Sequence, residues 1–172
     1  MRILGEVQKS KRKPKELVAF LAEKVRIDEE LFGELVDCLK TGTDVQKGIC
    51  AEVMEYVTKD NPELAGPYLD SIIAYINYDA PKVKWETARV VANVSRRSPE
   101  SVAKAIPKLL LNTEDTGTVV RWSAAYALTE IAKHNPELSL NLVPRFVKIM
   151  KKERNSGVKN VYLKALKLLT KE

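Results

Sequence analysis

Few side chains in the sequence could take part in catalysis. There is one histidine, His134, and there are two cysteines, Cys38 and Cys50. These three residues cannot supply the four ligands of a structural zinc site, and they form no conventional Ser/His/Asp or Cys/His set. No Asp or Glu lies in an apolar setting that would raise its pKa. The sequence therefore predicts a protein that is not an enzyme and that holds no metal and no cofactor.

Basic side chains recur at a fixed spacing and could contact phosphates or acidic side chains of an extended partner. The first basic column, with steps of 37, 37 and 38 residues, is Lys47, Lys84, Arg121 and Lys159. The second basic column is Lys59, Arg96 and Lys133, with Lys171 following at 38 residues. Basic residues near a helix end also complement the helix dipole. We favour a structural role for both columns over contact with a partner.

Two tryptophans, Trp85 and Trp122, stand 37 residues apart. At equivalent positions they could offer stacking platforms for bases or anchors for a peptide. Each is followed three positions later by an alanine that marks a close approach between helices, Ala88 or Ala125. Packing between repeats is the alternative role for the indoles, and it is the one that we favour.

Three four-residue motifs that contain proline, 37 residues apart, mark the starts of helices in this sequence. In each tetrad Asn or Ser can cap free backbone N–H groups, proline suits the first helical position and glutamate complements the helix dipole. The tetrads are Asn61-Pro62-Glu63-Leu64, Ser98-Pro99-Glu100-Ser101 and Asn135-Pro136-Glu137-Leu138. Apolar residues repeat at the same offset with helical spacing, and no pattern of period 2 competes with them.

These patterns predict an all-α chain, in which four helical pairs with a period of about 37 residues follow one leading helix. The expected helices are 14–26, 28–40, 44–59, 66–77, 83–97, 99–112, 119–134, 136–152 and 157–171. Internal prolines are expected to kink the first helix of a pair. Because successive pairs stack on one another, the chain should form an α-solenoid.

Residues 28–171 resemble the HEAT repeat family, within the armadillo/HEAT-type α-solenoids. Pro107 and Pro144 match the proline of a kinked first helix, and Asp79 and Asp115 match the aspartate of the connecting turn. Val120-Arg121 with Ala125 matches the opening of the second helix. The resemblance implies an interaction scaffold whose second helices line a concave face. It also implies that the basic residue at the Arg121 position pairs with a neighbouring turn aspartate.

Charge divides the chain into three zones. Residues 1–27 hold 8 Lys/Arg and 3 Asp/Glu, residues 28–79 hold 3 and 12, and residues 80–172 hold 18 and 8. We expect a basic N-terminal arm over residues 1–13 and a single HEAT-like repeat domain over residues 14–172. With no long apolar run and two cysteines expected to be buried in a reducing compartment, the chain is expected to be cytoplasmic.

The leading hypothesis for function is a non-catalytic scaffold that binds a protein partner through the concave second-helix face and is itself a monomer. The partner residues would come from the two basic columns and the two tryptophans. The first alternative is a nucleic-acid-binding protein, because some alkylpurine DNA glycosylases are similar in architecture and Trp85 and Trp122 are available here. No acidic residue matches their catalytic aspartate. The second alternative is salt-dependent head-to-tail self-association, because the acidic and basic zones are complementary.

Overall fold

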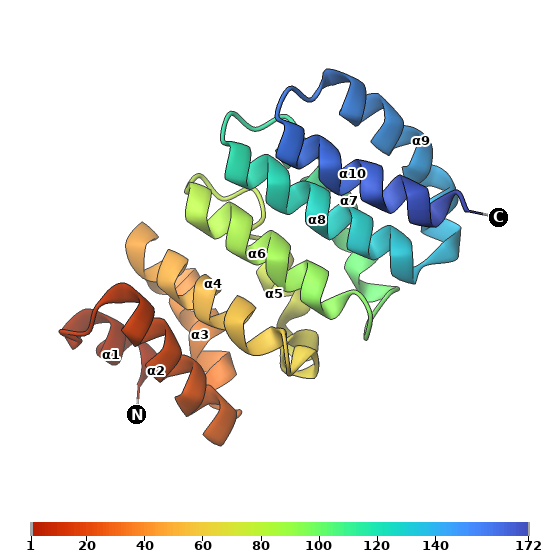
Figure 1. The fold of residues 1–172 in the computed structure, drawn as a ribbon. Coiled ribbons are helices and arrows are strands. Elements are labelled where there is room, and N and C mark those ends of the chain that lie inside the picture. The colour runs from red at the N-terminus through yellow and green to blue at the C-terminus, as the bar shows by residue number, and fades with distance from the viewer. Residues whose placement is uncertain (1, 172) are drawn as a thin grey trace.

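The computed structural model describes residues 2–171 as a chain of short helices joined by tight turns (Figure 1). The α-helices are α1 (Ile3–Lys9), α2 (Pro14–Ile27), α3 (Leu31–Thr41), α4 (Asp44–Thr58), α5 (Leu69–Ile73), α6 (Pro81–Val94), α7 (Ile106–Asn112), α8 (Thr118–His134), α9 (Pro136–Lys152) and α10 (Ser156–Leu169). Two 3-10 segments, η1 (Pro62–Tyr68) and η2 (Ser101–Ala105), precede α5 and α7. None of these helices is long and apolar enough to cross a membrane.

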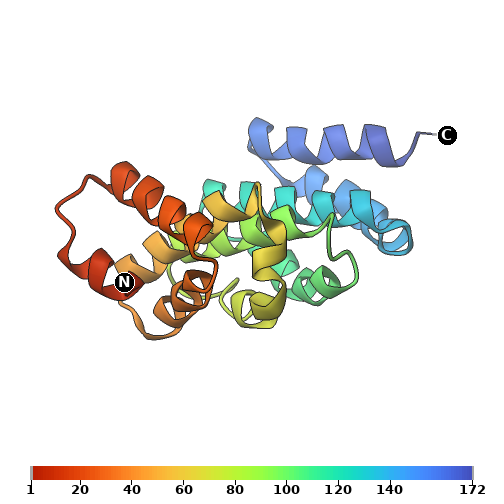
Figure 2. The same cartoon turned by 90° about the horizontal axis from the view of Figure 1, so that it is seen from below.

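The helices form two stacked layers that run the length of the molecule. In the second-helix layer, α2, α4, α6, α8 and α10 lie side by side, each in contact with the next (Figure 1). The first-helix layer, made of α1, α3, η1 with α5, η2 with α7, and α9, lies behind it (Figure 2). This arrangement confirms the predicted α-solenoid, in which each pair buries its apolar face against its neighbours.

The period predicted from the sequence is also confirmed. The second helices α4, α6, α8 and α10 begin at Asp44, Pro81, Thr118 and Ser156, which gives steps of 37, 37 and 38 residues. The starts have local causes. Thr43 accepts a hydrogen bond from the backbone N–H of Gln46, whose side chain accepts one from the N–H of Thr43, a reciprocal cap for α4. Asn155 caps α10 in a similar way, through the N–H of Val158.

The first helices are less regular than expected. The predicted helices 66–77 and 99–112 are each broken into a 3-10 segment and a short α-helix. Pro67 lies within η1, and Pro107 lies in the first turn of α7. Proline has no N–H and clashes with the preceding turn of an α-helix. The α-helix therefore begins just after Pro67 in one unit and just before Pro107 in the next, and a 3-10 segment precedes each helix. In contrast, α9 continues without a break past Pro144.

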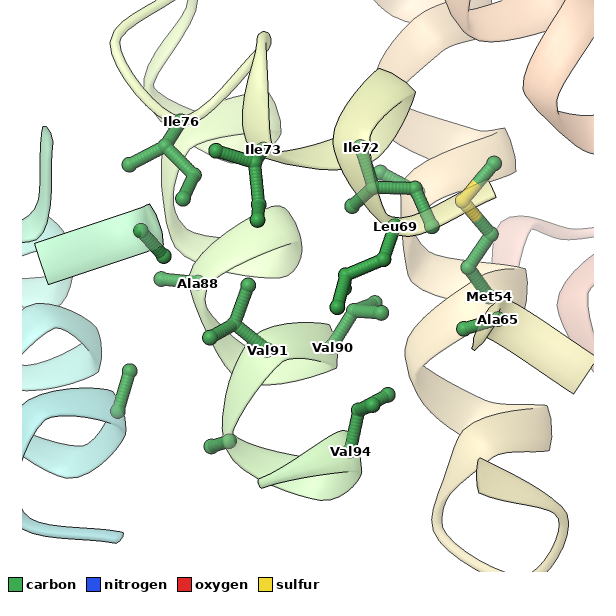
Figure 3. Packing of buried hydrophobic residues seen from close by; sticks show 14 of the residues in the cluster. Met54, Ala65, Leu69, Ile72, Ile73, Ile76, Ala88, Val90, Val91 and Val94 are labelled. Carbon is green, nitrogen blue, oxygen red and sulfur yellow. The ribbon is translucent and has the colours of Figure 1, made fainter. Parts of the chain in front are cut away.

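The core lies between the two layers and is continuous along the array. Figure 3 shows the part in which Met54 of α4 and Leu69 and Ile72 of α5 face the apolar side of α6. The side chains of Ala51, Ala88 and Ala125 are at most 1% exposed. The predicted alanine row is therefore buried, and its small side chains allow the second helices to approach one another closely.

The N-terminal segment contains more structure than the expected arm. Within residues 1–13, Ile3–Lys9 forms α1, and the side chain of Ile3 is fully buried. This helix contacts α3 and α4, so it extends the first-helix layer beyond α3. The physical reason is that Ile3, Leu4 and Val7 form an apolar face that covers the end of the core. The basic segment between α1 and α2 remains exposed.

Candidate functional site

The solvent-facing surface of the second-helix layer gathers polar and aromatic side chains from adjacent helices. We call its central part, on α4, α6 and α8, the second-helix face. It is formed by Glu52, Tyr56, Lys82, Trp85, Arg89, Asn93, Trp122, Tyr126 and Glu130, all exposed or half-buried. The 37-residue register brings these side chains together, because equivalent positions of successive second helices lie side by side.

The first basic column contacts its own chain at three of its four positions, beginning with Lys47. The side chain of Lys47 is buried, and its Nζ donates a hydrogen bond to the backbone carbonyl of Leu39 at 2.6 Å. The same ammonium lies 5.4 Å from the ring centroids of both Tyr75 and Tyr78. Lys47 therefore joins its own helical pair to the turn of the next pair.

Lys84 and Arg121 form ion pairs between successive units. Nζ of Lys84 lies 2.8 Å from Oδ2 of Asp115, and Nε of Arg121 lies 3.0 Å from Oε2 of Glu153. A second guanidinium nitrogen of Arg121 donates to Oε1 of Glu153 at 3.2 Å, so the pair is bidentate. Burial acts to raise the pKa of Glu153, but hydrogen bonds from Arg121 and from backbone N–H groups outweigh it and hold that pKa below its usual value. Lys159, the fourth member, is exposed and makes no ion pair within residues 2–171.

The second basic column lies at the opposite ends of the second helices. Lys59 pairs with Glu55 at 3.3 Å, and Lys133 pairs with Glu130 at 2.9 Å, in both cases within one helix. Arg96 is exposed and forms no ion pair within the described part of the chain. The structure thus places the two columns at opposite edges of the second-helix layer and does not bring them into one site.

The two tryptophans lie between these columns, both half-buried on the second-helix face. The ring of Trp122 stacks on Tyr126, with centroids 5.4 Å apart and planes inclined by 25°. The guanidinium of Arg89 lies 5.3 Å from the Trp122 ring centroid, and its Nε donates to Oγ of Ser123 at 3.0 Å. The Nε1–H of Trp85 donates to Oε1 of Glu86 at 2.9 Å. Trp122 is thus held by Tyr126 and Arg89 and Trp85 by Glu86, while both side chains remain partly accessible to solvent.

The unit before them has Gly48 at the tryptophan position, and Lys82 of α6 occupies the space. A Cβ on Gly48 would lie 3.1 Å from Cδ of Lys82. Nζ of Lys82 lies 2.6 Å from Oε1 of Glu52 on α4. A charged pair therefore replaces the indole at this end of the face.

Glu86 corrects the expectation that no acidic residue has a raised pKa. Its side chain is 5% exposed, and its Oε2 atom is buried with no hydrogen-bond partner. Burial, followed by repulsion from Glu55, raises the pKa of Glu86 to about 7, although Arg89 and the Trp85 indole act in the opposite direction. Sequence reasoning missed Glu86 because three charged residues, Lys82, Lys84 and Arg89, lie close to it in the sequence. The available signal was the register, which aligns Glu86 with Ile49 and with the buried Ser123.

The cysteines occupy the structural role that was expected. Cys38 of α3 and Cys50 of α4 are at most 1% exposed, which confirms the prediction of small buried side chains. The hydrogen bond with the Cys38 thiol, together with burial, raises the pKa of Cys50. Within residues 2–171, no group of three or more His, Cys, Asp or Glu side chains could hold a metal ion.

A cavity of about 410 Å³ lies away from the second-helix face, at the edge where the turn after α7 meets the end of α9. Its lining includes Lys148, Lys152 and Arg154. Arg121 and Glu153, which also line it, are already paired with each other. Glu114 and Asp115 line it too, so the cavity holds four cations and three carboxylates, and no buried donor in its lining is left without a partner within the described chain.

Comparisons with known proteins show the fold. No protein-family model matches the chain, and no curated protein matches its sequence. Two engineered proteins of known structure are similar, one at 18% identity with a TM-score of 0.76 and the other at 21% with a TM-score of 0.75. The match with the first protein covers 90% of this chain and 70% of that protein. The match with the second covers 94% of this chain and 77% of that protein.

A designed armadillo repeat protein in complex with the peptide (KR)4 is similar as well. It is 16% identical with a TM-score of 0.74, and the match covers 96% of this chain and 80% of that protein. At these identities the comparisons establish an armadillo/HEAT-type arrangement of helical repeats.

Proposed function

We propose that this armadillo/HEAT-type helical-repeat protein is a non-catalytic scaffold that binds an extended segment of a protein partner along its second-helix face. The observation that carries the proposal is the set of half-buried aromatic side chains on adjacent helices, Trp85 on α6 and Trp122 with Tyr126 on α8. Rigid aromatic side chains with one face in solvent are the usual anchors of protein interfaces.

The polar groups around these aromatic side chains also support binding of a protein segment. Arg89 of α6 lies on the same face, and of its guanidinium nitrogens only Nε is engaged within residues 2–171, so the other two can donate to a bound segment. Asn93 and Glu130 lie there too, but Nδ2 of Asn93 donates to Glu55 and Thr58, and Glu130 pairs with Lys133. The similar designed armadillo repeat protein is seen with a peptide bound, so the architecture is compatible with peptide binding. The aromatic anchors together with the polar groups favour a protein segment as ligand.

A selection of random peptides displayed on phage would test this proposal. Peptides that bind should lose at least about tenfold in affinity to Trp122→Ala and to the milder Trp122→Leu, measured by fluorescence anisotropy. Leu111→Ala is the matched control, because Leu111 is 66% exposed on α7 in the other layer. Circular dichroism would verify that each variant is folded. If the selected peptides bind the Trp122 variants as tightly as they bind the natural chain, and bind Leu111→Ala less tightly, the assignment of binding to the second-helix face is refuted.

Nucleic-acid binding is the second candidate, favoured by the exposed cations that have no carboxylate partner in the described chain. They include Arg96, Lys159 and the cavity residues Lys148, Lys152 and Arg154. Two members of the first basic column, Lys84 and Arg121, are engaged with carboxylates, which reduces the charge available to phosphates. Binding of labelled DNA or RNA that weakens steeply between two salt concentrations would favour this candidate.

Head-to-tail self-association has less support from the charge distribution. The acidic zone, residues 28–79, covers α3 to α5 in the interior of the array, and residues 1–27 at the N-terminal end carry a positive excess. Because the C-terminal units are basic too, the two ends of the array would repel each other.

A further inference from the structure

Three carboxyl groups of α4 and α6 lie on or just beneath the second-helix face, and two of them are in ion pairs. Glu52 pairs with Lys82 at 2.6 Å, and Glu55 pairs with Lys59 at 3.3 Å. Glu86, the third acidic residue, makes no ion pair within residues 2–171. Glu86 is therefore the only one of these three carboxyl groups without an ion pair in the described chain.

The nearest cation on the same helix is turned away from Glu86. Nε of Arg89 donates to Oγ of Ser123 on α8, and its guanidinium lies 5.3 Å from the Trp122 ring. Arg89 lowers the pKa of Glu86 only in part, since burial and the charges of Glu55 and Glu52 keep that pKa raised. The other titratable group that α8 brings to this region is Tyr126, whose pKa is itself raised by burial first and then by Glu130 and Glu55.

The carboxyl group of Glu86 is left half satisfied. Oε1 accepts a hydrogen bond from the Trp85 indole, while Oε2 is buried without a donor. A buried carboxylate without a partner is costly, so Glu86 keeps its proton to a higher pH than an exposed glutamate does. A cation supplied from outside would stabilise the ionised form in place of that proton.

The indole of Trp85 lies against the carboxyl group of Glu86. It is half-buried, and its hydrogen bond to Glu86 holds its Nε1 edge at the carboxyl group. The indole and the carboxyl group therefore lie side by side. An aromatic ring next to carboxylates is the environment that Lys and Arg side chains favour, because the π face and the negative charges attract the same group.

We propose that Glu86 and Trp85, with Glu52 and Glu55 of the neighbouring helix, form a subsite that receives one Lys or Arg side chain of the bound segment. The subsite rests on the proposed function, because it lies on the same second-helix face and deepens its specificity. The order of the groups along the face also predicts the neighbouring residue of the ligand.

The unit after this subsite has a different character. Ser123 occupies the position equivalent to Glu86, and the exposed faces are those of Trp122 and Tyr126. Adjacent helices lie about 8 to 10 Å apart, and an extended chain advances about 3.3 Å per residue. The bound segment should therefore place an apolar or aromatic residue about three positions from the Lys or Arg.

Fluorescence anisotropy with labelled peptides would test the subsite. The probes are an eight-residue peptide that holds one Arg with a Leu three positions away in a Gly/Ser background, and the same peptide with citrulline in place of Arg. The natural chain, Glu86→Gln and the control Glu29→Gln would be titrated at pH 6, 7 and 8 at constant ionic strength. Glu29 is exposed and its side chain has no partner within the described chain, so this control removes one charge away from the subsite.

The expected result is binding of the Arg peptide that tightens about tenfold from pH 6 to pH 8, because a group with a pKa of about 7 becomes ionised over this range. Glu86→Gln should remove both the pH dependence and at least about tenfold of the affinity at pH 8, while Glu29→Gln should change neither. Calorimetry at pH 7 in two buffers should detect the release of about half a proton on binding, which Glu86→Gln abolishes.

Equal affinity of the natural chain and Glu86→Gln for the Arg peptide at all three pH values would overturn the subsite. So would equal affinity for the Arg and citrulline peptides. In either case the proposed function still stands if selected peptides depend on Trp122. If no displayed peptide binds the natural chain, the proposed function and the subsite both fail.

Discussion

The burial of Glu86 makes the stability of the protein depend on pH in a way that one substitution should remove. The pKa of this group is about 7 in the folded chain and 4.5 in the unfolded chain. Since the folded pKa is the higher one, the folded state keeps a proton that the unfolded state releases. The contribution of Glu86 to stability is therefore intact below about pH 4.5 and is lost as the pH rises towards 7.

The size of the effect follows from the same two values. One pKa unit corresponds to about 1.4 kcal/mol, so the difference amounts to about 3 kcal/mol at pH 8. Glutamine has nearly the shape of protonated glutamate and carries no charge at any pH. Glu86→Gln should thus match the natural chain at pH 4.5 and exceed its free energy of unfolding by about 2 to 3 kcal/mol at pH 8.

Urea unfolding followed by circular dichroism, at half-unit steps from pH 4.5 to pH 8, would measure this difference. The groups with lowered pKa values, Asp115 and Glu153, are unchanged in both proteins and cancel when the variant is compared with the natural chain. Glu29→Gln serves as the control and should show a constant difference. A constant difference for Glu86→Gln as well would refute the reasoning, because Glu86 would then titrate alike in the folded and unfolded chains.

The test has a further use, because the variant expected to lose peptide binding is also expected to be more stable at neutral pH. Weaker binding by Glu86→Gln could not then be attributed to unfolding. A site that costs stability until its ligand arrives is common where function requires a charge in a buried place.

Two further substitutions test the packing between units. Arg121→Ala should lower the free energy of unfolding by about 3 kcal/mol, because Glu153, which is 7% exposed, loses its bidentate partner. Urea unfolding would measure the loss, and a change below about 1 kcal/mol would contradict the prediction. Tyr162→Phe should leave the free energy of unfolding unchanged or raise it by about 1 kcal/mol, because the buried hydroxyl has no hydrogen-bond partner. If thermal unfolding instead showed that this free energy falls by about 2 kcal/mol, the hydroxyl would have a partner in the folded protein.

The sequence by itself determined the repeat, because its signals are local. The proline tetrads, the helical spacing of apolar residues and the alanine row, Ala51, Ala88 and Ala125, each depend on a few neighbouring residues, and they recur at one offset. A 37-residue repeat of amphipathic helices has few ways to bury its apolar faces other than stacking. The second helices therefore begin where the pattern placed them.

Local signals were less decisive in the first helices. Pro107 and Pro144 occupy equivalent positions in the repeat, yet one opens α7 after a 3-10 segment and the other lies within the continuous helix α9. The segment Ile3–Lys9 looked like part of an arm because it is short and precedes a basic run. It is a helix because the end of the core offers Ile3 a place to be buried.

Only the tertiary structure decided what the charged residues do. Arg121 meets Glu153 from 32 residues away, and Lys84 meets Asp115 from 31 residues away, so part of the first basic column became a set of contacts between units. Nothing in the sequence around Glu86 marks it as a buried acid; its pKa is raised because the tertiary structure buries its carboxyl group and because α4 brings Glu55 beside it. Periodicity records which face of a helix is covered, but a pKa depends on the particular groups that cover it, and those come from another helix.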